Sequence, residues 1–225
     1  MTSSLMVDSI SDQLYRILVD RITSGAVDPG QRLDPQAVAA EFGVSRTPVR
    51  DALLRLERDR LIVTRPRAGT FVGTPGIEDV HDVCQLRKGL EWVATGIAAL
   101  QMPIAKVDEL RRESESALVA AEAGDFEPFF ASDSNIHLGI TEATGRSRLI
   151  ETRASVEPFV RWLRVLGATG PHRVAGSTQR HLEILDGIAA RDVEAAQRAA
   201  AIHLDEVNAW TVADMESAAI VLPVT

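Results

Sequence analysis

An aspartate and three histidines in the second half of the chain have the residue types and spacing of a metal site; they are Asp133, His137, His181 and His203. Asp133 and His137 are four residues apart, so on a helix their side chains lie on one face, close enough to hold one ion. A predicted turn near Arg191 lies ten residues after His181 and twelve before His203. At a rise of about 1.5 Å per residue, both histidines reach similar heights on an antiparallel pair of helices.

Three imidazoles and one carboxylate suit a borderline divalent cation such as Zn²⁺, Ni²⁺, Mn²⁺ or Fe²⁺, and we expect zinc or nickel. One or two coordination positions would stay open for the carboxylate of a small molecule. Arg87 is the candidate to bind that effector, by neutralising its second charge. Taken singly, each histidine is more simply a hydrogen-bonded interior residue, and Arg87 a surface partner of Glu91. The matched positions of the four residues together favour the metal site.

Apolar residues recur at helical spacing throughout the second half of the chain, between short breaks such as Gly124-Asp125 and Gly145. This pattern predicts an all-α bundle of six helices, at residues 77–100, 104–123, 126–143, 147–166, 174–190 and 193–215. We assign residues 77–225 to a helical domain for effector binding and dimerisation. The sequence Gly-Thr-Pro-Gly at residues 73–76 breaks regular structure and is the predicted linker that precedes this domain.

Residues 1–72 have the pattern of a winged helix-turn-helix domain. A short amphipathic helix from Pro35 to Phe42 leads to Gly43, which supplies the sharp turn of this motif. The next helix begins after Ser45, whose side-chain oxygen we expect to cap the free amides of its first turn. Short β-type runs then surround the turn-rich segment Arg-Pro-Arg-Ala-Gly at residues 65–69, which indicates a wing.

Arginines concentrate in this motif, although the chain as a whole is acidic. The formal net charge of the 225 residues is −8, yet residues 45–67 carry seven arginines against three acids, a local charge of +4. Arg46 and Arg50 lie one turn apart at the start of the second helix, from which arginine can read guanine in the major groove. Because the acidic remainder of the chain would repel DNA, we expect DNA to dock on this face only.

The order of these motifs is similar to that of GntR-superfamily transcription regulators of the FadR type, in the VanR-like group with an FCD effector domain. The resemblance covers nearly the whole chain, and it is most specific at residues 30–33, 45–53 and 65–70. In the second half, the spacing of Arg87 and Glu91 and the candidate metal residues match the family more loosely. The resemblance implies DNA contacts by Ser45, Arg46, Thr47, Arg50, Arg67 and the wing glycine Gly69.

The resemblance also implies a homodimer on a two-fold related operator, because a symmetric protein reads a symmetric site. We therefore expect a DNA-binding transcriptional regulator, a repressor, whose operator binding is controlled by a small organic acid bound next to the metal. One alternative is a regulator with a purely structural metal, which would show a closed four-ligand shell with no cavity beside it. The other is a metal-dependent enzyme; since we find no second catalytic constellation, we expect no enzymatic activity.

Other features of the sequence set outer bounds on these expectations. No stretch is apolar for the length of a membrane span, and residues 1–7 lack the pattern of an export signal, so we expect a cytoplasmic protein without membrane contact. Cys84 is the single cysteine, which excludes an intrachain disulfide and favours a small buried side chain. Arg161 and Arg164 are further candidates for a pocket cation, but solvated helix positions are the simpler expectation for both.

Overall fold

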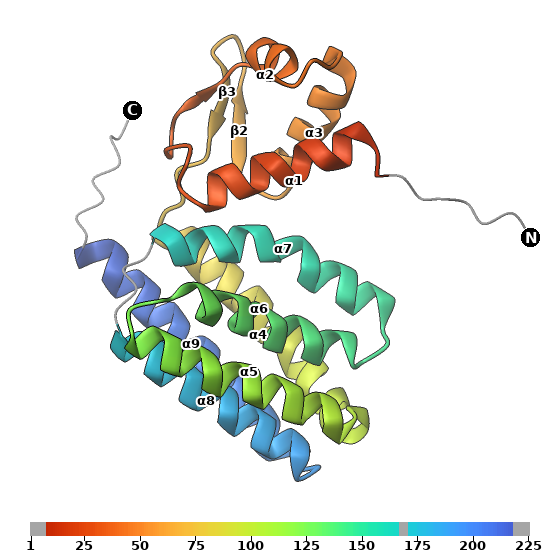
Figure 1. Cartoon of the computed structure of the whole chain (residues 1–225), viewed down its shortest axis with the longest axis vertical. Helices are drawn as coiled ribbons and strands as arrows, with labels where there is room; N and C mark the ends of the chain where they lie inside the picture. The colour runs from red at the N-terminus through yellow and green to blue at the C-terminus, as the bar shows by residue number, and fades with distance from the viewer. Residues whose placement is uncertain (1–7, 167–170, 218–225) are drawn as a thin grey trace, which may run out of the picture. The chain divides into compact units, whose positions relative to one another are not determined.

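The computed structural model describes residues 8–166 and 171–217 of the chain. The chain divides into two compact units between Thr74 and Pro75 (Figure 1). Most of the described residues are helical, and the short strands among them all lie in the first unit. This arrangement confirms the predicted fold class, in which a winged helix-turn-helix unit is followed by an all-helical unit.

From residue 8 onward, the first unit combines three helices with a small antiparallel sheet. Its helices and strands are α1 (Ile10–Thr23), β1 (Arg32–Leu33), α2 (Pro35–Glu41), α3 (Arg46–Arg58), β2 (Ile62–Arg65) and β3 (Gly69–Val72). Strand β3 lies in the middle of the sheet, and it pairs with β2 to form the wing. Strand β1 was not predicted from the sequence, because two residues are too short to show an alternating pattern.

The helix-turn-helix is formed by α2 and α3. Gly43 in the turn has a φ of +62°, a conformation that glycine adopts without steric cost. The apolar face of α3 is buried, and its central residues Val49 and Leu56 are fully inaccessible to solvent. Ser45 is the residue that precedes α3, but its side chain forms no capping hydrogen bond, so the predicted cap is wrong. The amides of that first turn remain open to other acceptors.

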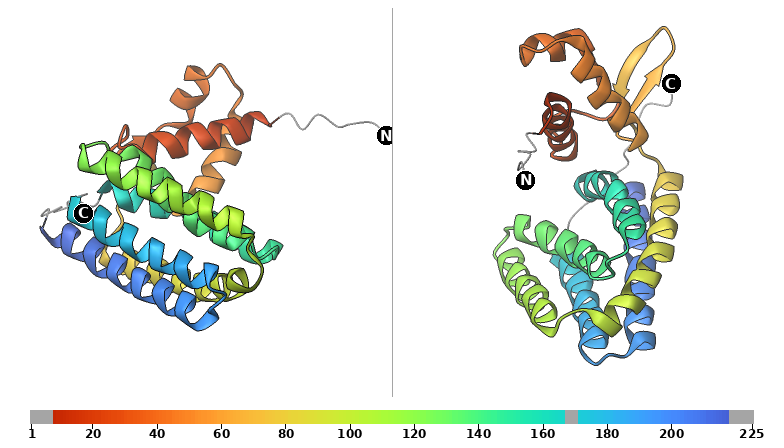
Figure 2. Two further views of the ribbon diagram at one scale, coloured as in Figure 1. Left: turned by 60° about the horizontal axis from the view of Figure 1, so that its bottom comes forward. Right: turned by 90° about the vertical axis from the view of Figure 1, so that its right-hand side faces the viewer.

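The described part of the second unit contains six helices. They are α4 (Ile77–Gln101), α5 (Ile104–Glu122), α6 (Glu127–Glu142), α7 (Ser147–Leu166), α8 (Pro171–Ala189) and α9 (Val193–Ser217). These bounds follow the predicted ranges closely, because each break carries a residue that ends a helix. Helices α8 and α9 are consecutive and lie side by side, as the views in Figure 2 show. No helix among the described residues is long and apolar enough to cross a lipid bilayer.

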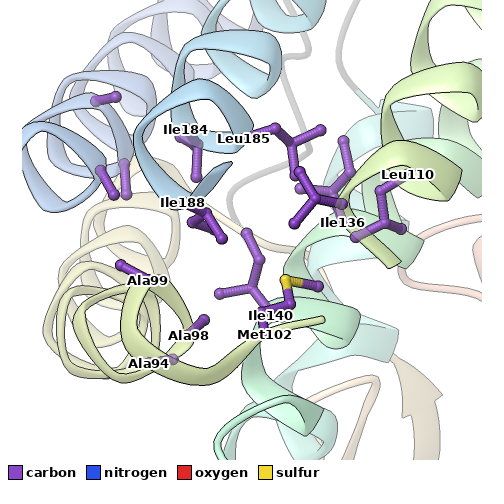
Figure 3. Close-up of a cluster of buried hydrophobic side chains, with 14 residues drawn as sticks. Ala94, Ala98, Ala99, Met102, Leu110, Ile136, Ile140, Ile184, Leu185 and Ile188 are labelled. Carbon is purple, nitrogen blue, oxygen red and sulfur yellow. The ribbon is translucent and has the colours of Figure 1, made fainter. Parts of the chain in front are cut away.

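Five of these helices share one buried apolar cluster (Figure 3). Alanines from α4 and α9 meet larger aliphatic side chains from α5, α6 and α8, including Leu110, Ile136 and Ile188. Gly187 lets α8 and α9 approach closely, because a Cβ at this position would lie 2.6 Å from the backbone nitrogen of Ala196. The cluster and this close crossing hold α6, α8 and α9 together, and these are the helices that carry the candidate metal ligands.

Candidate metal centre and recognition surface

The four residues predicted to bind a metal are brought together inside the second unit. Asp133 and His137 come from α6, His181 from α8 and His203 from α9, and all four are buried. One potential ligand atom from each residue lies within 4.8 Å of the others. The expected matching heights of His181 and His203 are therefore found, with their ring centroids 4.6 Å apart.

Several ring nitrogens of these histidines face one another or lack a hydrogen-bond partner among the described residues. The Nε2 atoms of His137 and His203 are 3.1 Å apart, and Nε2 of His181 is 3.4 Å from Oδ1 of Asp133. Neither ring nitrogen of His181 nor Nδ1 of His203 has a hydrogen-bond partner among the described residues. Buried polar atoms without a partner are costly, and a cation between these side chains would pair with one nitrogen of each ring. The donor set therefore fits a divalent metal ion.

The protonation states of these side chains also suit metal binding. Burial lowers the pKa of His137 and lowers the pKa of His203 well below its usual value, so both imidazoles are neutral near pH 7. For Asp133, burial opposes ionisation, but Arg164 and the nearby histidines outweigh it and hold the pKa well below its usual value. Neutral imidazoles and an ionised carboxylate are the forms that bind metals.

Glu91 on α4 connects one candidate ligand to two arginines. Its Oε2 atom accepts a hydrogen bond from Nδ1 of His137 at 2.7 Å, which leaves Nε2 of that ring directed at the candidate site. Its Oε1 atom accepts from Nε of Arg87 at 2.8 Å and from Nε of Arg153 at 2.7 Å. The simpler expectation of a surface pair between Arg87 and Glu91 is wrong about its location, because both side chains are buried.

A cavity of about 60 Å³ adjoins the candidate metal site. Asp133 lines it together with three arginines, Arg87, Arg164 and Arg173. Much of the remaining wall is apolar, with side chains such as Val83, Val160, Leu163, Phe129 and Trp210. A space with positive charge, apolar walls and a metal-binding carboxylate can bind a small anion that has a hydrocarbon backbone.

The sequence identified one of the three cavity arginines as a ligand contact, namely Arg87. Arg164 was expected to be solvated, and this expectation is wrong, because its side chain is only 14% exposed and forms an ion pair with Asp133. Arg161, three residues earlier on α7, is exposed as expected. Arg173 was missed; it lies near the start of α8 and pairs with Asp214 of α9. No periodic pattern marks a charged residue that turns inward beside other charges.

Cys84 also belongs to the wall of this cavity. It is buried and unpaired, and burial raises the pKa of its thiol, so the thiol form persists near pH 7. This confirms the expectation of a small buried side chain. The thiolate is the form that attacks electrophiles and binds metals, and at Cys84 this form is disfavoured.

In the first unit, the residues expected to contact DNA are exposed, except Gly69, which is half-buried. Arg46, Thr47 and Arg50 lie on the first two turns of α3 and line an open groove that also includes Thr64 and Thr70 of the wing. Arg46 and Arg50 are exposed, so their positive charge is available to a polyanion.

The tip of the wing holds two further residues expected to contact DNA, Arg67 and Gly69. Arg67 has a φ of +65°, and Gly69 has a φ of +122°, where a side chain would be strained. A Cβ at Gly69 would also approach Nε of Arg32 to 3.2 Å. Glycine is therefore needed for this turn, which presents Arg67 to solvent.

Comparison with known proteins agrees with this architecture. Residues 10–72 match the family of bacterial regulatory proteins called the gntR family, and residues 82–206, more than half of the chain, match the FCD domain. The HTH-type transcriptional repressor RspR of Escherichia coli K12 is 27% identical over 199 residues, 88% of this chain and 87% of that protein. An HTH-type transcriptional regulator of Streptomyces ambofaciens is 30% identical over 198 residues, 86% of this chain and 81% of that protein.

A solved structure has a similar fold. Escherichia coli McbR/YncC superposes with a TM-score of 0.74 at 25% identity, covering 91% of this chain and 98% of that protein. Together, the winged helix-turn-helix unit, the helical unit and the relatives indicate a protein that binds DNA and regulates transcription. The chain therefore belongs to the gntR family of bacterial transcriptional regulators, among the members that carry an FCD domain.

Proposed function

We propose that this regulator senses a small organic acid, bound beside a divalent metal ion in the helical unit, and that the acid changes the affinity of the protein for its operator. One observation carries the proposal. Asp133 is at once a member of the candidate metal group and part of the wall of a cavity that three arginines also line. An anion in this cavity can therefore contact the metal and an arginine together.

In this proposal Asp133, His137, His181 and His203 hold the metal, with zinc or nickel as the expected ion. The ion would supply a Lewis-acidic contact for a carboxylate oxygen of the effector. Arg87 would bind the effector from the α4 side, because its Nη2 atom is buried and has no hydrogen-bond partner among the described residues. A carboxylate that accepts a hydrogen bond from this atom would remove the energetic cost of leaving it buried without a partner.

The charge balance favours an anion over a neutral ligand. Around the centre, the buried positive side chains of Arg87, Arg153 and Arg164 are balanced by three carboxylates, those of Asp133, Glu91 and Glu157. A divalent cation adds two positive charges to this balanced set. An effector with one or two carboxylates would neutralise that excess in a region that water does not screen.

We also propose which residues of the first unit contact DNA. We expect Arg46 and Arg50 to contact base edges or phosphates in the major groove, with Ser45 and Thr47 on the phosphate backbone. The wing residues Arg67 and Gly69 would approach the adjacent backbone or minor groove. As a regulator of genes, the protein is expected to act in the cytoplasm and without catalytic activity.

The functional form is expected to be a homodimer on a two-fold related operator. Helix α4 supports this expectation, because Leu86, Val93 and Leu100 recur every seven residues and are 46%, 49% and 69% exposed. Exposed apolar side chains in one row on a helix are typical of an interface between copies. A pair of identical units would place two α3 helices on two operator half-sites.

A mobility-shift titration tests the sensor role. Operator DNA is titrated with the metal-loaded protein in the presence of short mono- and dicarboxylic acids, and each titration is repeated with a chelator. We expect at least one acid to change DNA affinity by about 5- to 150-fold, and the chelator to remove that response. If no acid changes the affinity under either condition, the sensor role is wrong.

Two other functions predict different results. A purely structural metal would leave DNA affinity insensitive to every acid, while chelation would still lower the stability of the protein; the cavity beside Asp133 argues against this alternative. A metal-dependent enzyme would convert one of the acids, which a product assay on the same samples would detect. The family consists of regulators, and we expect no such turnover.

A further inference from the structure

Helix α7 carries three charged side chains that point to the candidate metal centre although none of them is a candidate ligand. We call Arg153, Glu157 and Arg164 the α7 triad. Their spacing of four and seven residues places them on one face of the helix. Arg153 is fully buried, and Glu157 and Arg164 are 15% and 14% exposed. Three charges turned inward on one helix need a specific reason, because buried charges are costly without partners.

The members of the α7 triad are joined to one another. Nη1 of Arg153 donates to Oε2 of Glu157 at 2.7 Å, and Nη1 of Arg164 donates to Oε1 of Glu157 at 3.2 Å. Ser134 of α6 completes the connection, since its hydroxyl donates to Glu157 at 2.6 Å and accepts from Arg164 at 2.9 Å. The triad is thus one connected unit and not three separate ion pairs.

Both ends of this unit reach a candidate metal ligand on α6. At one end, Arg164 forms an ion pair with Oδ2 of Asp133, which leaves Oδ1 facing the histidines. At the other end, Arg153 donates to Glu91, whose second oxygen accepts from His137. The triad therefore contacts one of the two candidate ligands of α6, Asp133, directly, and it reaches the other, His137, through Glu91.

We propose that the α7 triad orients Asp133 and His137 for metal binding, so that metal binding and the docking of α7 on the bundle stabilise each other. The inference rests on the metal centre of the proposed function. When a metal-binding side chain is already held in its binding orientation, metal binding does not have to order it. The affinity for the metal is therefore higher. Because such coupling is reciprocal, the bound ion must also hold α7 in place.

The sequence of α7 fits a helix that depends on these contacts. Pro158 lies inside α7 and has no backbone amide hydrogen, so the helix loses one of its own hydrogen bonds beside Glu157. Helix α7 also contributes Val160, Leu163 and Arg164 to the wall of the cavity. An anion in the cavity would therefore contact α7, the helix whose docking depends on the metal. Effector binding would thus act on the docking of this helix.

Zinc titration of the metal-free full-length protein tests the positioning role. Arg164→Gln should weaken zinc binding by about 10- to 100-fold, the range for residues that orient metal ligands. Arg164→Lys keeps the charge without the planar fork and should recover part of the loss. Arg161→Gln removes an exposed arginine of the same helix and should bind zinc as the wild type does. Equal zinc affinity of Arg164→Gln and the wild type would overturn the inference.

Hydrogen exchange of the wild-type protein gives an independent readout. Zinc should slow amide exchange along residues 147–166, and this protection should be lost in Arg164→Gln. If zinc protects α6, α8 and α9 but leaves α7 unchanged, the inference is wrong even though the metal centre stands. If the wild type binds no zinc, the metal centre itself is wrong and this inference fails with it.

A milder variant covers the case in which Arg164→Gln does not fold. Ser134→Ala removes the hydroxyl that joins Glu157 to Arg164 and leaves all the charges in place. We expect zinc affinity to fall by about 2- to 10-fold, as for the loss of one hydrogen bond. Unchanged affinity together with unchanged zinc protection of α7 would contradict the proposal.

Discussion

The two units of this regulator use arginine in opposite ways. In the first unit Arg46, Arg50 and Arg67 are exposed on a helix start and a wing tip, where solvent surrounds them. In the second unit Arg87 and Arg153 are buried and each donates to the carboxylate of Glu91. One unit presents positive charge to a partner, and the other encloses it around a candidate binding site.

This difference determines what each set of arginines contributes. Exposed arginines cost little to keep in the free protein and act mainly through phosphate and base contacts, which salt weakens. Buried arginines are costly unless every charge has a partner, so their positions are fixed and the loss of one partner is destabilising. Substitutions in the first unit should therefore change binding without changing stability, whereas substitutions in the second unit should change both.

The largest effect is expected from the double substitution of Arg46 and Arg50 by alanine. A good bidentate contact to a base contributes about 1–3 kcal/mol, so the loss of two should weaken operator binding by about 30-fold or more. Arg58→Ala, at the exposed end of the same helix, is the matched control and should have a much smaller effect. Fluorescence anisotropy with labelled operator measures the affinities. A double variant that binds like the wild type would remove α3 from the interface.

Substitution of a candidate metal ligand should instead change the stability of the protein. At zinc concentrations about 100 times the dissociation constant, the ion should stabilise the wild type by about 2.7 kcal/mol. His203→Ala should lose that gain, because it removes one of the four candidate ligands. Thermal unfolding with zinc and with chelator measures the difference. A zinc-dependent increase in Tm that survives in His203→Ala would exclude this residue as a ligand.

Gly187→Ala should have a smaller effect on stability, and it tests how α8 and α9 are held. The added Cβ would meet the backbone of Ala196 at 2.6 Å, so the two helices must separate slightly. We expect a loss of about 1–3 kcal/mol, as for overpacking, together with weaker zinc binding. Gly89→Ala is the control, since nothing lies within 4 Å of a Cβ at that position of α4. Equal stability of the two variants would show that the close crossing is unimportant.

The smallest effect concerns Glu157 and pH. Burial opposes its ionisation, but Arg164 and Arg153 outweigh burial and lower its pKa from 4.5 to about 2. A pKa lowered by folding gives stability that is complete above about pH 4.5 and disappears as the pH falls toward 2. Near neutral pH, the free energy of unfolding of the wild type should be about 1–2 kcal/mol higher than that of Glu157→Gln. Urea unfolding of the metal-free proteins should show this difference shrinking with acid; a constant difference would contradict the assignment.

Much of the second unit could be predicted from sequence because its signals are periodic. Apolar residues at helical spacing and glycine or Arg-Asp breaks located all six helices, and the distances of His181 and His203 from the turn at Arg191 placed their rings at one height. In the first unit the order of helix, turn, helix and wing was similarly clear. These features depend on local spacing, which a single sequence records.

The residues that sequence reasoning missed act through contacts between distant elements. Glu91 is joined to Arg153, 62 residues away, and Arg164 to Asp133 on another helix. A charged residue on a helix is usually solvated, so the sequence favours a surface position for Arg164. Its inward position depends on the packing of α7 against α6. Ser45 was expected to cap α3 from its residue type and its position before the helix, but a single sequence does not give the rotamer that a capping hydrogen bond needs.

The most direct test of the account is the location of the ion itself. Crystals of the protein loaded with zinc would be measured above and below the zinc absorption edge. We predict one strong anomalous peak among Asp133, His137, His181 and His203, with zinc about 2.0–2.2 Å from three imidazole nitrogens and one carboxylate oxygen. A zinc-saturated crystal with no peak between these side chains would contradict the metal centre and the sensor mechanism built on it.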